Sequence, residues 1–219
     1  MFAAPHRIIL PELLDDAPPE EARKSLQDLV RINRWFGGYS TLRKIFGEFV
    51  QRSDSFSVLD VGAASGDMGA ILRRIYPRAF VTSLDYRTDH LAAAADPRVI
   101  ADAFRLPFRE RSFDFVFSSL FLHHFSDERV VELLSSFRSA ARVAVTAIDL
   151  DRGPLAYHFV PATNWLFRWH PLTLNDAPIS VAASFKKEEL VGLANRAGLT
   201  RARARTYQPW ARIALVAPV

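Results

Sequence analysis

An alternation of short apolar runs with amphipathic stretches, from Phe56 to the C-terminus, constrains the fold of this chain more than any other feature. The run Phe56 to Val61 leads into a glycine-rich turn and then a helical pattern, and this order recurs. Such alternation predicts a mainly parallel sheet with helices on both faces. Seven strands are expected, at residues 56–61, 79–84, 98–101, 113–118, 142–148, 200–207 and 211–216. The last two are joined by a turn so short that they must pair antiparallel.

Helical patterns occupy the rest of this region and the N-terminal part of the chain. Between the strands, helices are expected at residues 68–76, 89–95, 127–140 and 186–197. Two further helices, 20–36 and 41–51, precede the first strand and are separated by Gly37-Gly38. These patterns predict an N-terminal helical cap, 1–52, and an α/β core, 53–219, with residues 149–185 as an insert.

Composition narrows the classes of function. Apolar residues make up 49 % of the 219 residues, enough for a large core, and the absence of cysteine excludes disulfides, zinc–thiolate sites and thiol nucleophiles. The net charge is +4, and the charged residues are spread along the chain without a block of like charges, so no nucleic-acid partner is expected. No apolar run reaches about 18 residues, so we expect no stable membrane insertion and a cytoplasmic location.

The first motif, VLDVGAASGDMG, joins a buried strand to a helix. Its small residues let a ligand approach the backbone closely, and a helix N-terminus offers free N–H groups. Its glycines, at positions 62, 66 and 69, do not match the G-x-G-x-x-G spacing of nicotinamide enzymes. Asp60 would repel a pyrophosphate but suits an ammonium group, although a carboxylate at this position also serves as a simple cap.

The second motif, SLDYRTD, ends the second strand. Asp85 stands 23 residues after Gly62, where a carboxylate can accept both hydroxyls of a ribose. Tyr86 is placed either to lie along an adenine ring or to pack in the ordinary way.

The third motif, ADAFRLPFRERSFDFVFSSLFLHHF, decides between these possibilities. With the other two motifs in order, it resembles the signature of the type 11 group of class I methyltransferases, which includes the ubiquinone and menaquinone C-methyltransferases. The resemblance covers about residues 56–148. It implies a Rossmann-like α/β fold with a seven-stranded, mainly parallel sheet and one antiparallel strand. It also implies S-adenosylmethionine as the cofactor.

The resemblance also implies roles for individual residues. Asp102, with the Ala103 N–H beside it, would bind the adenine, and Asp85 would bind the ribose. The backbone at Ser118 would help to hold the methionine part, together with the turn that runs from Asp60 through Gly62, Ala63 and Ala64 to Gly66. Ala64 departs from the pattern, because the family usually has glycine there.

Two further segments bear on the acceptor. PELLDD and RINRWFGG, near the N-terminus, resemble a bacterial subgroup often encoded beside type III polyketide synthases, which implies phenolic or alkyl-chain acceptors. The insert 149–185 is rich in aromatic residues and, by the resemblance, covers the acceptor. An aromatic lid suits an apolar acceptor. The alternative roles of the insert are a helix packed at the sheet edge and a membrane-docking surface.

Candidate catalytic residues follow two strands. His123 and His124 come after the fourth expected strand, and Asp149 comes after the fifth. We favour His124 as the general base that deprotonates the acceptor, oriented by Asp149, while a structural role for both histidines is the alternative. The spacing of the histidines predicts no metal site.

The sequence therefore predicts an enzyme that transfers methyl groups from S-adenosylmethionine to a small, largely apolar acceptor in secondary metabolism. The acceptor would be phenolic, quinone-like or polyketide-derived, and methylated on oxygen or carbon. A nicotinamide-dependent oxidoreductase and a catalytically silent binding protein of the same fold are the alternatives. The acceptor itself and the oligomeric state stay open.

Overall fold

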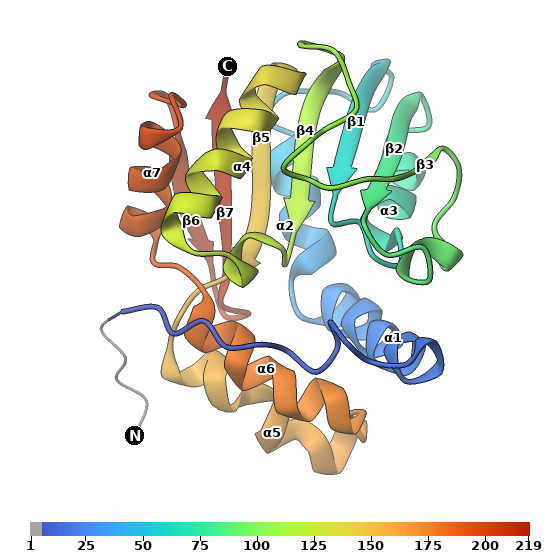
Figure 1. Ribbon diagram of the computed structural model, residues 1–219, viewed down its shortest axis with the longest axis vertical. Helices are drawn as coiled ribbons and strands as arrows, with labels where there is room; N and C mark the ends of the chain where they lie inside the picture. Colours follow the sequence, from blue (N-terminus) through green and yellow to red (C-terminus); the bar gives the residue numbers. More distant parts are fainter. Residues whose placement is uncertain (1–5) are drawn as a thin grey trace.

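A seven-stranded sheet forms the centre of the computed structural model, which describes residues 6–219 (Figure 1). The strand order is β3-β2-β1-β4-β5-β7-β6, and every neighbouring pair is parallel except for β7, which runs antiparallel to both β5 and β6. The strands are β1 (Phe56–Val61), β2 (Ala79–Asp85), β3 (Arg98–Ile100), β4 (Phe113–Ser119), β5 (Ala141–Leu150), β6 (Arg203–Tyr207) and β7 (Arg212–Pro218). The predicted fold class, with a single antiparallel strand, is confirmed.

Helices cover both faces of the sheet because each face is almost entirely apolar. On one face lie α4 (Asp127–Ala140) and α7 (Lys187–Arg196), and on the other lie α2 (Gly38–Phe46) and α3 (Asp67–Ile75). Each pair of helices completes one large cluster of buried side chains. A strand buried on both sides explains why β1 and β4 read as continuous apolar runs rather than as alternating patterns.

A third group of elements covers the carboxyl ends of the parallel strands (Figure 1). It consists of α1 (Pro19–Trp35), α5 (Pro154–Phe167), α6 (Pro171–Ala183) and the segment 6–18, which we call the N-terminal strap. The strap lies on α6, where Asp176 accepts the backbone N–H groups of Leu13 and Leu14. Two 3-10 turns, η1 (His90–Ala93) and η2 (Leu122–His124), follow β2 and β4 at the same edge, where open α/β sheets bind ligands.

The second helix begins earlier than predicted, at Gly38, because only Gly37 adopts a left-handed backbone, with φ of +85°. Gly38 is helical, and a Cβ there would lie 2.6 Å from Oδ1 of Asn33, so close packing requires this glycine. The helix also ends earlier, at Phe46. Other bounds shift: the helix expected at 89–95 is a single 3-10 turn, and the strand expected from residue 200 starts at 203.

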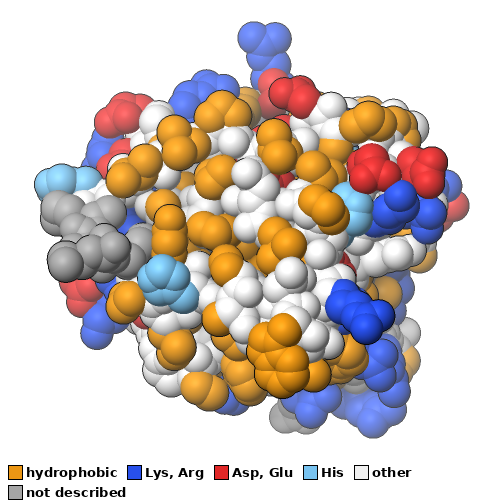
Figure 2. Space-filling view, turned by 90° about the horizontal axis from the view of Figure 1, so that it is seen from below, with side chains coloured by type: hydrophobic (Ala, Val, Ile, Leu, Met, Phe, Trp, Pro, Cys, Tyr) orange, Lys and Arg blue, Asp and Glu red, His pale blue; other side chains and the backbone are white. Residues whose placement is uncertain are grey.

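The insert folds into a pair of helices, α5 and α6, that contact each other. Its aromatic side chains divide between two environments: Trp169 is buried, whereas Trp165 is 82 % exposed. Figure 2, which views the molecule from below, shows hydrophobic side chains spread over this face, with most charged ones toward its edges. Within residues 6–219, none of the helices has both the length and the apolar character needed to cross a membrane.

Candidate active site

A cavity of about 890 Å³ lies at the carboxyl ends of β1, β2 and β4. The strap, α1, α5 and α6 form its other walls, so segments from both ends of the sequence enclose it. Its volume is within the range of small-molecule sites. Charged and polar groups concentrate near the strand ends. Apart from Asn33, the walls formed by α1, by the residue that follows it and by α5 are apolar and include Leu26, Leu29, Ile32, Phe36, Leu155, Phe159 and Val160.

The turn after β1 is built so that the backbone approaches the cavity closely. Gly62 has φ of +68°, and a Cβ at this position would lie 2.4 Å from Cδ2 of Phe121. Gly66, with φ of +70°, is packed against Ala94. Ala64 also has a left-handed backbone, with φ of +45°, which strains a residue that carries a Cβ. The Ala64 N–H donates a 3.0 Å hydrogen bond to Oδ2 of Asp85, which helps to hold the turn.

The three predicted acidic residues occupy different positions around this turn. Asp60 is buried, and its Oδ2 has no hydrogen-bond partner among residues 6–219. Burial, reinforced by the charge of Asp67, raises the pKa of Asp60 well above its usual range. A ligand that donates a hydrogen bond or carries a positive charge would therefore satisfy this carboxyl group. Asp85 is held by the N–H groups of Ala64 and Arg87, and exposed Asp102 accepts the N–H of Phe104.

Most of the residues predicted to bind the cofactor line this cavity. The lining includes Asp60, Gly62, Ala63, Ala64, Asp85, Tyr86, Asp102 and Ala103. Tyr86 is 61 % exposed, so its ring is available to a ligand rather than packed in the core. Gly66 and Ser118 are not part of the lining; their neighbours Ser65 and Ser119 are.

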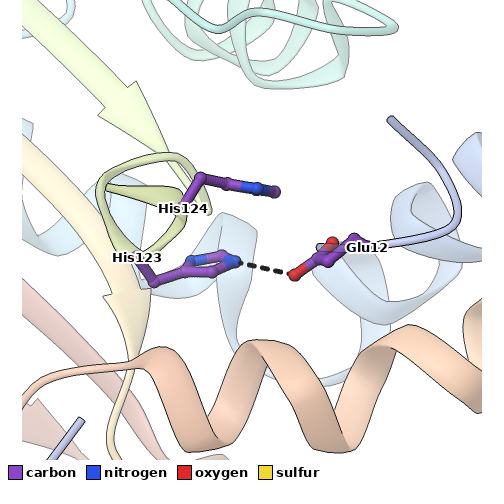
Figure 3. Close-up of side chains that lie close together, drawn as sticks. All are labelled: Glu12, His123 and His124. Atoms are coloured by element: carbon purple, nitrogen blue, oxygen red, sulfur yellow. Dashed lines mark ion pairs between the residues drawn. The ribbon is translucent and has the colours of Figure 1, made fainter. Parts of the chain in front are cut away.

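Opposite these groups, η2 carries the two histidines, whose rings stack with centroids 4.4 Å apart (Figure 3). Nδ1 of His123 lies 2.7 Å from Oδ1 of Asp149, and its Nε2 lies 3.4 Å from Oε1 of Glu12, which comes from the strap. All three of these side chains are buried. Burial alone would lower the pKa of His123, but Asp149 and Glu12 together raise it to about 10. His123 is therefore a cation at neutral pH, held between two carboxylates.

The expected pairing of Asp149 with His124 is wrong, because Asp149 contacts His123 instead. Burial and the positive charge of His123 both lower the pKa of His124, so this imidazole is neutral near pH 7. Its nearest carboxylate is that of Asp15 in the strap, with Nδ1 and Oδ2 3.8 Å apart. His124 lines the cavity and retains a lone pair that can accept a proton.

Glu12, His123 and His124 are also close enough together to be considered as metal ligands, since their ligand atoms lie within 4.8 Å of one another. The two histidine rings are nearly parallel, at 26°, so their in-plane nitrogens do not converge on one point. We assign no metal to this cluster.

The sequence reasoning missed several polar residues that line the cavity, among them Glu12, His90 and Arg212. Glu12 lies within the PELLDD motif, which indicated only a subgroup. His90 comes directly after the SLDYRTD motif, and its buried Nε2 has no partner in the described part of the chain. Arg212 left a clear signal in the sequence, because it is a charged residue at the start of an otherwise apolar strand.

Comparison with known proteins relates part of the chain to one family. Residues 59–144 match the family model described as "Methyltransferase domain". These residues make up less than half of the chain, and they are similar to a methyltransferase domain, in agreement with the three motifs. The matched segment runs from the middle of β1 into β5, and so contains the glycine-rich turn and both histidines.

Individual relatives match only part of the chain. It is 32 % identical to a demethylmenaquinone methyltransferase of Thermotoga maritima over 101 residues, 44 % of either chain. It is 36 % identical to malonyl-[acyl-carrier protein] O-methyltransferase 1 of Coxiella burnetii over 35 % of this chain and 27 % of that one. The chain thus spans less than half the length of the curated relatives it matches.

Solved structures extend the likeness in fold to nearly the whole chain. A SAM-dependent methyltransferase from Aquifex aeolicus superimposes with a TM-score of 0.62 over 93 % of this chain and 99 % of that chain, at 16 % identity. At this identity the likeness concerns the fold alone.

Proposed function

We propose that this protein transfers a methyl group from S-adenosylmethionine to a small, largely apolar acceptor, in secondary metabolism. The observation that carries the proposal is the division of one cavity into two parts. One part is bounded by the glycine-rich turn and three acidic residues, and the other by apolar side chains and a neutral histidine. A reaction between a polar cofactor and an apolar acceptor requires a cavity that combines a polar part with an apolar part.

The residues of the first part fit the cofactor. The buried, unpartnered Oδ2 of Asp60 can receive the ammonium group of the amino-acid part. Asp85 can accept the ribose hydroxyls, and Asp102 and Ala103 can bind the adenine edge. Tyr86, exposed at the rim, is available to the adenine face. When bound, S-adenosylmethionine supplies an activated methyl group on a sulfonium.

The second part suits a phenolic, quinone-like or polyketide-derived acceptor. Phe36 and Phe159 meet edge-to-face, with centroids 4.7 Å apart, and form an aromatic wall between α1 and α5. This arrangement favours the interpretation of the insert as an aromatic lid. The named relatives include both a quinone-precursor methyltransferase and an O-methyltransferase, so the proposal covers carbon and oxygen as the methylated atom.

His124 is the proposed general base. A phenol has a pKa of about 10, so it carries its proton at pH 7, and removing that proton as the methyl group arrives gains about 10²–10⁴-fold in rate. Holding the reactants in line contributes more, roughly 7–11 kcal/mol. His123 stays protonated between Glu12 and Asp149, so its role is to position η2 and keep His124 neutral.

The test is transfer of an isotopically labelled methyl group from S-adenosylmethionine to a panel of phenols, alkylresorcinols and quinols. The expected product gains one methyl group, and NMR identifies the methylated atom. Binding of the cofactor without transfer to any acceptor would favour the silent binding protein. Tight binding of NAD(H), with no response to the sulfonium cofactor, would favour the oxidoreductase.

A further inference from the structure

The guanidinium of Arg212, at the start of β7, is buried in the wall of the cavity with only 1 % of the residue exposed. Its Nε donates to the carbonyl of Phe36 at 3.1 Å, and Nη2 donates to Oδ1 of Asn33 at 3.3 Å. Nη1 has no hydrogen-bond partner within residues 6–219. Both partners of this cation are neutral oxygens, so its charge is not matched by a contacting carboxylate.

A buried cation that makes no direct contact with an anion is costly. The penalty for removing an ion from water is several kcal/mol even after relaxation. Burial lowers the pKa of Arg212 to about 10 although the nearby charges of Asp149 and Asp67 act to raise it, so the group remains charged at neutral pH. Arg152, which is about as deeply buried, shows how a buried arginine is usually neutralised, because its Nη2 lies 2.7 Å from Oε1 of Glu189. The contrast indicates that an anionic ligand completes the surroundings of Arg212.

The position of Arg212 points toward the amino-acid end of the cofactor. Asn33 accepts from Arg212 and donates to Oδ2 of Asp67 at 3.1 Å, and Asp67 is the first residue of α3. Through Asn33, the arginine is thus connected to the end of the glycine-rich turn. In the sheet, Arg212 pairs with Leu150, which also lines the cavity. Arg212 is therefore linked both to the start of α3 and to the end of β5.

We propose that Arg212 is the carboxylate-binding residue of this cavity. A guanidinium matches a planar carboxylate better than any other anion-binding side chain. The carboxylate comes either from the methionine end of the cofactor, which the link to Asp67 favours, or from an acidic acceptor. This inference rests on the proposed function for the identity of the cofactor, while the unmatched cation is independent of it.

Calorimetry with two probes tests the cofactor as the source. S-adenosylhomocysteine carries the carboxylate, whereas 5′-methylthioadenosine has the same nucleoside and lacks the amino-acid part. We expect Arg212→Met to weaken binding of S-adenosylhomocysteine about 10- to 150-fold, equivalent to roughly 1.5–3 kcal/mol, and to leave methylthioadenosine binding unchanged. Arg152→Met is the matched control, because it removes a buried arginine outside the cavity and should change neither affinity.

A second pair of probes, 4-hydroxybenzoate and phenol, tests an acidic acceptor in the presence of S-adenosylhomocysteine. Selective loss of hydroxybenzoate binding in Arg212→Met would assign the carboxylate to the acceptor. Equal affinities of wild type and Arg212→Met for all four probes would overturn the proposal. If the wild type binds neither nucleoside, the proposed function fails instead.

Thermal unfolding without ligand gives a separate measurement. Arg212→Met removes a buried charge that no carboxylate contacts, but it also deprives the carbonyl of Phe36 and Oδ1 of Asn33 of this donor. Arg152→Met breaks the ion pair with Glu189, which is the more destabilising change. We therefore expect Arg212→Met to lower the melting temperature less than Arg152→Met does. An equal or larger loss in Arg212→Met would mean that the guanidinium is already satisfied in the free protein, and would contradict the inference.

Discussion

Replacing Glu12 with glutamine tests the buried ion pair between the strap and His123. Two unit charges at the observed 3.4 Å interact by about 5 kcal/mol at an effective dielectric constant of about 20. The rise in the pKa of His123 from 6.5 to about 10 also corresponds to about 5 kcal/mol, which Asp149 shares. Glutamine keeps the size of the side chain and can still accept from Ser180. The net loss should therefore be about 1.5–3 kcal/mol.

The assay is thermal unfolding between pH 5 and pH 11, where a loss of this size lowers the melting temperature by roughly 3–12 °C. His123 has a raised pKa, so its contribution is complete below pH 6.5 and is lost as the pH rises through about 10. Glu12 has a pKa lowered to about 2, so it stays ionised across this range. The difference between wild type and variant should be largest at pH 5–6.5 and should close above pH 10.

Glu20→Gln is the control, because Glu20 is exposed in the first turn of α1 and makes only a 3.5 Å contact with Lys24. It should change the melting temperature by no more than about 4 °C, since exposed pairs contribute about 0–1 kcal/mol. A Glu12→Gln effect no larger than that of the control would refute the ion pair. An effect of constant size up to pH 11 would show that the contribution does not depend on the charge of His123.

Three further predictions concern the cavity. His124→Ala should lower kcat about 100-fold or more without changing cofactor affinity, and it should remove the acidic limb of the pH–rate profile. In the wild type this limb lies below pH 6.5, because the pKa of His124 is lowered. An unchanged profile would leave the histidine without a catalytic role. Asp85→Asn should weaken cofactor binding about tenfold in calorimetry. The control Asp114→Asn, which removes a backbone-binding carboxylate from the far end of the sheet, should leave cofactor binding unchanged. Equal cofactor affinities of wild type and Asp85→Asn would place the ribose elsewhere. Ala64→Gly should raise the free energy of unfolding by up to about 1 kcal/mol, because it relieves the backbone strain of an alanine in the left-handed conformation. A lower melting temperature would show that the turn tolerates this strain without cost.

The positions of the strands along the chain and of the cofactor motifs were predictable because they depend on local patterns. A strand buried on both faces must be a continuous apolar run, and a turn that approaches a ligand must have small residues. These requirements act within a few residues of Val58 or Gly62. The sequence alone therefore determined the fold class, the glycine-rich turn and the acidic residues at the strand ends.

The partners of the histidines were not predictable. His123 and His124 are neighbours in sequence, and only the path of η2 decides that the first faces Asp149 and the second faces the cavity. Glu12 reaches His123 from more than a hundred residues away because the strap crosses the strand ends, held by hydrogen bonds to α6.

What the tertiary structure alone decided is therefore the electrostatic state of the site. The pKa of an imidazole depends on burial and on charges within a few ångströms, and in this protein those charges come from distant parts of the chain. The same holds for Arg212, which is visible in the sequence as a charge in an apolar strand. Only packing shows that it is buried in the cavity wall, where its Nη1 has no hydrogen-bond partner in the described part of the chain.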